Sequence, residues 1–525
     1  MWWTKKKREK RDKRMGKSRP ANRRHLRFEG LEDRRLLAGL VDVQVFPLLA
    51  PGRLDLVGDL SNNDVRMSQT VNVGEYRIDG LNGTLLQING AGVTMPSVTV
   101  NGITGDIRVY LGDGDDSFKF DNTYAQNGQR SNVPVDLSIE NSHGSNTNQI
   151  VDVMINGDFE VIKAGGTTGF SQLHVTNTTV IGYTTVDNTA GGTGGDTETK
   201  INNAWLQGNG GPSPAFVLYN GDGNDIIDVQ GNSQFGIGPF PLGPVIVIDN
   251  GEGASRTTFT GAGAEAGFGT TTVYGDLSIT NGTNLPGTLD TVTFNGSNVL
   301  GNVSIDNGDG NTSVTVNNST LGSHLVAPPF APVLGGSLQI YNDAGYDQFS
   351  MIDSKAPWGI LINNDITGNN DVWGSATNIV GSEIGTAPFG PAIGGFPGAA
   401  LVLLGDNGRD VVNVNNTVLG GTLHLDLFNG NNQVDLTNGT SMNALHLVTG
   451  NGNDSVLIDN SRIAVAVYVR LGDGADQFFV RNVDPATQWP SPLLGLIDID
   501  GGPGVDTTNL SALALGALGF EIFVP

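Results

Sequence analysis

The residues with the clearest capacity for chemistry are aspartates that recur in short Gly-x-Asp turns. Carboxylate oxygens that converge with backbone carbonyls at turns form the oxygen cages that Ca2+ prefers. The candidate Ca2+ ligands are Asp113, Asp116, Asp222, Asp225, Asp410, Asp454, Asp473, Asp476 and Asp506. The alternative role is structural, because glycine takes positive φ values and aspartate bonds to nearby backbone in tight corners. The sequence leaves both interpretations open and indicates no other cofactor.

These turns resemble a known calcium-binding repeat. Four segments fit most of the nonapeptide Gly-Gly-x-Gly-x-Asp-x-U-x, where U is a large apolar residue: Leu111–Lys119, Asn220–Asp228, Thr449–Leu457 and Leu471–Phe479. The pattern is similar to the RTX repeats of secreted bacterial proteins, and the resemblance implies calcium between stacked turns. RTX motifs follow one another every nine residues, whereas here the motif occurs once in 22, and Asn432 and Thr312 replace the acid in two copies.

Other residue patterns give little indication of catalysis. His424 and His446 lie 22 residues apart, with Tyr468 next, and stacked imidazoles can bind a transition metal. Because a third ligand is missing, we expect the two histidines to be solvated surface residues instead of metal ligands. Enzymes of β-helix fold that hydrolyse pectin-like polysaccharides carry Gly-His-Gly-like and Arg-x-Lys-like segments, and this chain has neither. We therefore expect no catalytic residues and no enzyme activity.

Four loops rich in proline and aromatic residues interrupt a repeat of 22 residues. They are Phe235–Pro244, Ala327–Gly335, Ala387–Gly398 and Val483–Leu494, and each directly precedes an apolar strand-like segment. Insertions on one side of a repeat protein often build its binding surface. The candidate binding-face aromatics are Phe240, Phe330, Phe389, Phe396 and Trp489. Their rings would stack on an extracellular polysaccharide or a surface protein, or the loops would fold down over an apolar side.

The elements that must position these residues follow from the 22-residue period. Between residues 401 and 483, four kinds of residue recur at this step: glycines, acidic residues, asparagines and apolar residues. Leu425, Leu447 and Val469 are one such apolar series. Apolar residues alternate with polar ones on both sides of each turn, which is typical of strands with one buried face. We predict an all-β protein, a single-stranded parallel β-helix (β-solenoid) with rungs of about 22 residues. Asn416, Asn438, Asn460 and Asn482 are expected to form an amide ladder at one corner.

Composition excludes several classes of protein. The 525 residues include 76 glycines and no cysteine and carry a net charge of −24, so disulfides and thiolate sites are excluded. Residues 1–38 contain 15 Lys and Arg and 5 Asp and Glu. Residues 39–525, the body of the chain, contain 14 Lys and Arg and 48 Asp and Glu. The body thus has the wrong charge for nucleic acid. No apolar run is long enough for a transmembrane segment.

The first forty residues form a separate basic segment. Within it, Leu31, Glu32, Arg34, Leu36 and Leu37 resemble the LEPR-XLL segment of large exported or surface proteins of planctomycete bacteria. Asp33 stands where that segment usually has proline. The resemblance implies sorting to the cell exterior, with processing near Ala38-Gly39.

We therefore expect four parts: a disordered basic export segment (1–38), an N-terminal β region or cap (39–95), a β-solenoid (96–510) and an apolar C-terminal cap (511–525). The expected protein is secreted or on the cell surface and serves, without enzymatic activity, as a surface, matrix or adhesion module, with calcium as a candidate stabiliser. Two alternatives stay open. One is a divergent polysaccharide-active β-helix enzyme, a lyase or hydrolase, which would be favoured by three or more carboxylates converging in a groove. The other is an intracellular protein whose basic arm binds nucleic acid.

Overall fold

The computed structural model describes the part of the chain beyond the basic segment. The described residues are 39–46, 52–125, 128–163, 169–189, 195–211, 213–237, 244–261, 270–283, 288–323, 336–364, 373–387, 392–393, 396–482, 496–510 and 522–523. The chain divides into two units, Met1–Leu37 and Ala38–Pro525. The predicted segment 1–38 and most of the predicted cap 511–525 lie outside the described residues. The described strands all belong to the second unit.

Each repeat contributes a first strand to a long parallel sheet, and we call this series of strands face A. Every strand pairs in parallel with the corresponding strand of the next repeat. The strands are β7 (Ile107–Tyr110), β10 (Leu137–Asn141), β13 (Phe159–Lys163), β16 (Thr184–Asp187), β19 (Phe216–Tyr219), β22 (Pro244–Asp249), β25 (Asp276–Thr280), β28 (Val303–Asp306), β31 (Leu338–Tyr341), β34 (Ile360–Asn363), β39 (Ala399–Leu404), β42 (Thr422–Asp426), β44 (Ser441–Val448), β46 (Arg462–Arg470) and β48 (Leu496–Asp500).

After a corner, each repeat contributes a second strand to a second parallel sheet, face B. Its pairing is again from one repeat to the next. The strands are β8 (Ser117–Asp121), β11 (Asn146–Val151), β14 (Ser171–Thr176), β17 (Thr197–Asn202), β20 (Asp225–Gln230), β23 (Ser255–Thr260), β26 (Leu289–Asn295), β29 (Asn311–Asn317), β32 (Asp347–Ile352), β35 (Ser375–Val380), β40 (Val411–Asn415), β43 (Gln433–Thr437), β45 (Ser455–Asp459), β47 (Gln477–Arg481), β49 (Thr507–Thr508) and β50 (Ile522–Phe523).

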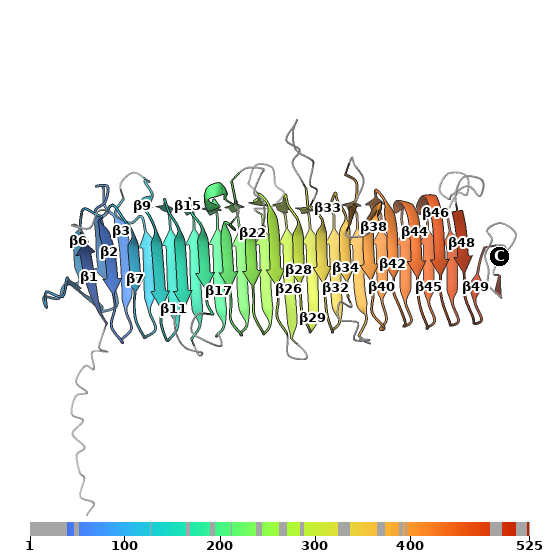
Figure 1. The fold of residues 1–525 in the computed structure, drawn as a ribbon, viewed down its shortest axis with the longest axis horizontal. Helices are drawn as coiled ribbons and strands as arrows, with labels where there is room; N and C mark the ends of the chain where they lie inside the picture. Colours follow the sequence, from blue (N-terminus) through green and yellow to red (C-terminus); the bar gives the residue numbers. More distant parts are fainter. Residues whose placement is uncertain are drawn as a thin grey trace, which may run out of the picture. The chain divides into compact units, whose positions relative to one another are not determined.

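A short third strand returns the chain to face A. These strands are β9 (Ser131–Val133), β12 (Val153–Ile155), β15 (Thr179–Val180), β18 (Trp205–Leu206), β21 (Gln234–Phe235), β24 (Thr271–Val273), β27 (Ser297–Val299), β30 (Thr320–Leu321), β33 (Lys355–Ala356), β36 (Glu383–Ile384) and β41 (Val418–Leu419). A 3-10 turn, η1 (Gly208–Gly210), follows β18. Figure 1 shows the strands of this unit side by side in sequence order, which is consistent with the predicted solenoid. No helix in the described ranges is long and apolar enough to cross a membrane.

The N-terminal end differs from the repeats by its antiparallel pairs. It comprises β1 (Leu40–Phe46), β2 (Arg53–Val57), β3 (Asp64–Gln69), β4 (Tyr76–Gly80), β5 (Leu85–Ile88) and β6 (Ser97–Val100). β1 pairs antiparallel with β2, and β4 pairs antiparallel with both β3 and β6. β2 and β3 then pair in parallel with β7 and β8, where the regular stacking begins. The antiparallel region thus extends to residue 100, slightly beyond the predicted boundary at 95.

The predicted core columns are confirmed. Leu425 pairs with Leu447, and Leu447 pairs with Val469, in adjacent strands of face A. All three side chains are fully buried in one cluster that runs through the unit. Since every repeat places its apolar residues at the same register, hydrophobic burial and strand pairing stabilise the same alignment of strands.

The predicted asparagine ladder at 416, 438, 460 and 482 does not form. These four residues adopt positive φ values of 49°, 56°, 48° and 52°, and their side chains are not buried. Asn416 and Asn438 donate their backbone N–H groups to carbonyl oxygens of the next repeat, at 3.1 and 3.2 Å. Asparagine recurs here because it tolerates the left-handed conformation that this corner requires, and not because its amide bonds along the stack.

A buried amide ladder exists instead at the end of the face A strands. Each side-chain amide donates Nδ2–H to Oδ1 of the next, at 2.7 to 3.0 Å. The members are Asn188, Asn220, Asn250, Asn281, Asn307, Asn342 and Asn364, all at most 7% exposed. Because each amide supplies the acceptor that its neighbour needs, the column satisfies polar groups that would otherwise be buried at a cost.

We predict that Leu447→Ala lowers the free energy of unfolding by about 2–5 kcal/mol, because the side chain is fully buried and its removal leaves a cavity. Urea denaturation followed by circular dichroism measures the change. Val465→Ala is the matched control: Val465 lies on the same strand, β46, as Val469 but is 55% exposed. Equal effects of the two substitutions would contradict the assigned core.

Candidate functional site

The predicted turn aspartates fall into two groups at the corner between faces A and B. Asp116, Asp225, Asp410, Asp454, Asp476 and Asp506 are 0–3% exposed. Asp222 and Asp473 are not buried and lie in the preceding turn, and the Asp113 side chain is 45% exposed. The two acids of one Gly-Asp-Gly-x-Asp segment thus have different surroundings, although the sequence presents them as one motif.

The buried aspartates form a ladder of hydrogen bonds, which we call the inner ladder. Each Oδ1 accepts the backbone N–H of the equivalent residue in the preceding repeat. Asn432 donates to Asp454 at 2.7 Å, Asp454 to Asp476 at 2.8 Å, and Asp476 to Asp506 at 2.9 Å. These N–H groups lie at a corner where the strand pairing is interrupted, so the carboxylate oxygen replaces a missing backbone acceptor.

An outer ladder runs beside it in the opposite direction. In three repeats the residue before the inner-ladder position is at the surface, and its side-chain oxygen accepts an N–H from the following repeat. Asp115 accepts from Ser145 at 2.8 Å, Asn431 from Asn453 at 2.7 Å, and Asn453 from Ala475 at 2.8 Å. Both ladders therefore give the turn residues a structural role. Within the described ranges, no three acidic or histidine side chains lie close enough together to hold a metal ion.

Burial raises the pKa of the inner-ladder carboxyl groups. The pKa of Asp410 rises to about 8, those of Asp225 and Asp476 to about 7, and those of Asp116 and Asp454 to about 6. In these five residues Oδ2 is buried without a hydrogen-bond partner. The hydrogen bonds to Oδ1 favour the ionised form, but Oδ2 would have to leave water without a donor, so burial outweighs them and raises the pKa.

This arrangement predicts that stability decreases as the pH rises. The unfolded chain releases these protons near pH 4, whereas the folded chain retains them up to about pH 6 for Asp454 and about pH 8 for Asp410. The free energy of unfolding should therefore fall across that interval. Asp454→Asn should reduce the fall between about pH 4 and pH 6, because an amide needs no proton and Asn432 already occupies the same ladder. Urea unfolding across pH measures this, with Asp222→Asn, outside the inner ladder, as control; equal pH profiles for the two variants would contradict it.

The predicted histidine column is stacked and half-buried rather than fully solvated. His424 and His446 have parallel rings 4.4 Å apart, and His446 stacks on Tyr468 at 4.7 Å. Phe396, from the antiparallel pair β37 (Ala392–Ile393) and β38 (Phe396–Pro397), covers His424 at 4.8 Å. Burial lowers the pKa of both histidines.

The described part of the third insertion thus folds down over face A. Ile393, 2% exposed, packs in a small cluster with Leu361 and Val402 on the outer side of the sheet. Phe396 is half-buried beside this cluster, which agrees with the covering alternative for this loop. The other candidate aromatics, Phe240, Phe330, Phe389 and Trp489, lie outside the described residues, so their role in binding stays a prediction.

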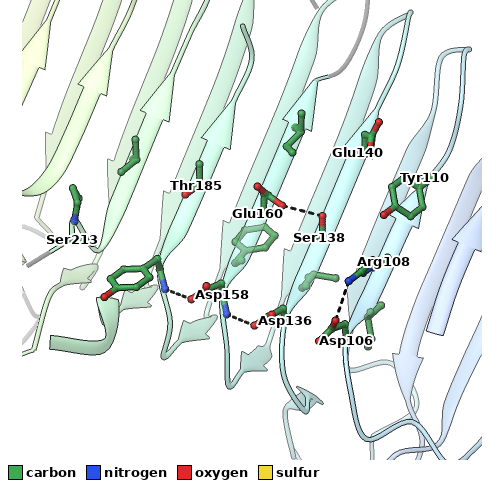
Figure 2. Close-up of a pocket in the computed structure, with 17 residues that line it drawn as sticks. Asp106, Arg108, Tyr110, Asp136, Ser138, Glu140, Asp158, Glu160, Thr185 and Ser213 are labelled. Carbon is green, nitrogen blue, oxygen red and sulfur yellow. Dashed lines mark hydrogen bonds and ion pairs between the residues drawn. The ribbon is translucent and has the colours of Figure 1, made fainter. Parts of the chain in front are cut away.

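Sequence analysis missed a groove on the outer side of face A. It has a volume of about 620 Å3 and is lined by residues in or beside β7, β10, β13, β16 and β19. Figure 2 shows the side chains that line it. Strand register arranges its side chains in rows along the stack. One row contains Asp106, Asp136 and Asp158 before the strands, and the next contains Arg108, Ser138, Glu160 and Thr185. Tyr110, Glu140 and Ile162 form a third.

Most acids of the groove have partners in the protein. Asp136 and Asp158 each accept a backbone N–H from the next repeat at 2.8 Å. Asp106 pairs with Arg108 at 3.3 Å, and Glu160 accepts the Ser138 hydroxyl at 3.3 Å. The carboxylates follow the groove in rows rather than converging on one point.

Comparison with known proteins gives one match. Residues 22–41 match the family described as Planctomycete extracellular. This supports the planctomycete extracellular segment implied by the sequence and indicates an extracellular location. The match includes the first two residues of β1 and leaves the repeats unassigned. Comparison with curated proteins and with solved structures gives no match.

Proposed function

We propose that this chain is an exported β-solenoid that serves, without catalysing a reaction, as a cell-surface, matrix or adhesion module. The observation that carries the proposal is the extracellular family match at residues 22–41, in a chain whose strands from β7 and β8 onward stack in parallel. Parallel stacking of repeats presents long regular faces to solvent, which suits contact with polymers or other surfaces.

The regular spacing of outward positions supports a binding role. Inward positions of the strands are taken by the common core, so outward positions can vary without changing the fold. The groove over β7–β19 and the covered aromatic stack of β42–β46 are two such regions with different chemistry. An extracellular polysaccharide or a surface protein is the partner class that we propose for these faces.

A second candidate function is a polysaccharide-active enzyme. The observation in its favour is that five carboxylates line the groove: Asp106, Asp136, Glu140, Asp158 and Glu160. Catalysis by a carboxylate pair requires one acid and one base facing the same bond, and four of these five groups are held by contacts within the protein. Such an enzyme would release new reducing ends from its polysaccharide.

We also propose that Ca2+ stabilises the folded chain through its turn carboxylates. Asp454 and Asp476 stack in adjacent repeats with Oδ2 atoms that lack partners, so a cation beside them would reduce their mutual repulsion. At pH 8 and constant ionic strength, millimolar Ca2+ should raise the melting temperature more than Mg2+ does. The double variant Asp454→Asn/Asp476→Asn should lose this difference. Identical melting curves with Ca2+ and with chelator would contradict stabilisation by Ca2+. The aspartates would then have only the structural role of forming the corner.

Export can be tested in the producing bacterium. We predict that protease added to intact cells digests the protein, or that the protein is found in the medium, and that mass spectrometry places the mature N-terminus near Gly39. A variant lacking residues 1–38 should remain inside the cell, because the export segment is missing. A protein that is protected in intact cells and retains residues 1–38 would contradict the proposal and support the nucleic-acid alternative.

A further inference from the structure

The groove over β7, β10, β13, β16 and β19 has the dimensions of an extended ligand. Neighbouring strands lie about 4.8 Å apart, so five strands span about 19 Å along the stack. Its floor is rigid, because the inward residues of the same strands, such as Ile107, Leu137 and Phe159, are fully buried in the common core. A chain-like ligand could therefore lie across the strands and meet equivalent rows in each repeat.

The polar groups of the groove suit a ligand rich in hydroxyl groups. Thr185 and Ser213 contribute hydroxyls that can both donate and accept hydrogen bonds, and the Ser138 hydroxyl, which donates to Glu160, can accept one; all three are labelled in Figure 2. Tyr110 at one end offers an aromatic ring beside Glu140, its neighbour across the strands. Hydroxyls, carboxylate acceptors and a tyrosine ring together are the groups that hold sugar rings by hydrogen bonds and stacking.

The charge of the groove selects among such ligands. Five carboxylates line it, against the single guanidinium of Arg108, which is paired with Asp106. Glu160 is exposed and Glu140 is half-buried, and both lie in rows that face the groove. An acidic polysaccharide would be repelled, whereas a ligand with positive charges spaced along its length would be attracted.

We propose that this groove binds a linear glycan that carries free amino groups, with Glu140 and Glu160 facing the ammonium groups. The hydroxyl groups of Ser138 and Thr185 and the ring of Tyr110 contact the sugar rings. A basic peptide would meet the same charges, and it is the competing ligand class in the test below. The inference rests on the proposed extracellular location, since it names the partner class that the module would meet there.

The test is calorimetric titration of the full chain with a glucosamine oligomer of four to six sugars. The matched ligands are the fully N-acetylated oligomer, which lacks the charge, and a galacturonate oligomer, which reverses it. We expect binding of the amino glycan, at least tenfold weaker binding of the acetylated one and none of the acidic one. Affinity for the amino glycan should fall as ionic strength rises.

The double variant Glu140→Gln/Glu160→Gln should weaken binding of the amino glycan at least tenfold. Both side chains point outward from face A, and the melting temperature of the variant confirms that it folds. Glu252→Gln is the control, because Glu252 lies in a turn outside the groove and leaves the lining unchanged. Unaltered affinity in the double variant, or equal loss in the control, would overturn the assignment to this groove.

A pentalysine peptide serves as the competing ligand class. If it binds as tightly as the amino glycan and loses affinity equally in the double variant, the glycan assignment is wrong and the groove recognises positive charge alone. Absence of binding by the glucosamine oligomer would also overturn the inference. Neither result bears on export, which is tested separately by protease accessibility and by the mature N-terminus.

Discussion

The constraint on which this structure depends is the supply of acceptors for backbone N–H groups at the corners. Between faces A and B the chain turns out of the pairing direction, and N–H groups there are buried without a carbonyl opposite. Side-chain oxygens one repeat away supply the acceptor, as Asp454 does for Asn432 and Asp476 does for Asp454. Stacking each repeat on the next is therefore necessary for satisfying the corners, and not only for pairing the strands.

This constraint explains why the identity of the corner residue varies while its role does not. Asn432 occupies the same ladder as Asp410 and accepts its N–H at 3.0 Å. Ser375 occupies it one repeat earlier and donates both its N–H and its hydroxyl to Asp410. The position requires a short polar side chain, and in the aspartates the hydrogen bond to Oδ1 favours the ionised form although burial outweighs it. The second oxygen, Oδ2, is buried without a partner. It therefore adds no hydrogen bond, and its burial raises the pKa of the aspartates.

The sequence predicted the repeat, the parallel strands and the core, because the 22-residue step from Leu425 to Leu447 to Val469 is unbroken. It did not predict the amide ladder from Asn188 to Asn364, since insertions separate its members by 22 to 35 residues and obscure the column. It also could not show that Asp476 is buried whereas Asp473 is exposed. Inward and outward residues alternate within a strand, but the residues of the turn between two strands do not follow this alternation.

The groove could not be predicted for a related reason. Inward positions repeat because each must fit the same core and the same ladder, and this repetition is what made the fold visible in the sequence. Outward positions such as Ser138, Glu160 and Thr185 lie in one row yet share no residue type. Recognition chemistry in a stacked protein thus depends on the residues that deviate from the repeat, and it becomes apparent only when strand register places them side by side. The periodic residues determine where a ligand can lie, and the non-periodic ones determine which ligand it is.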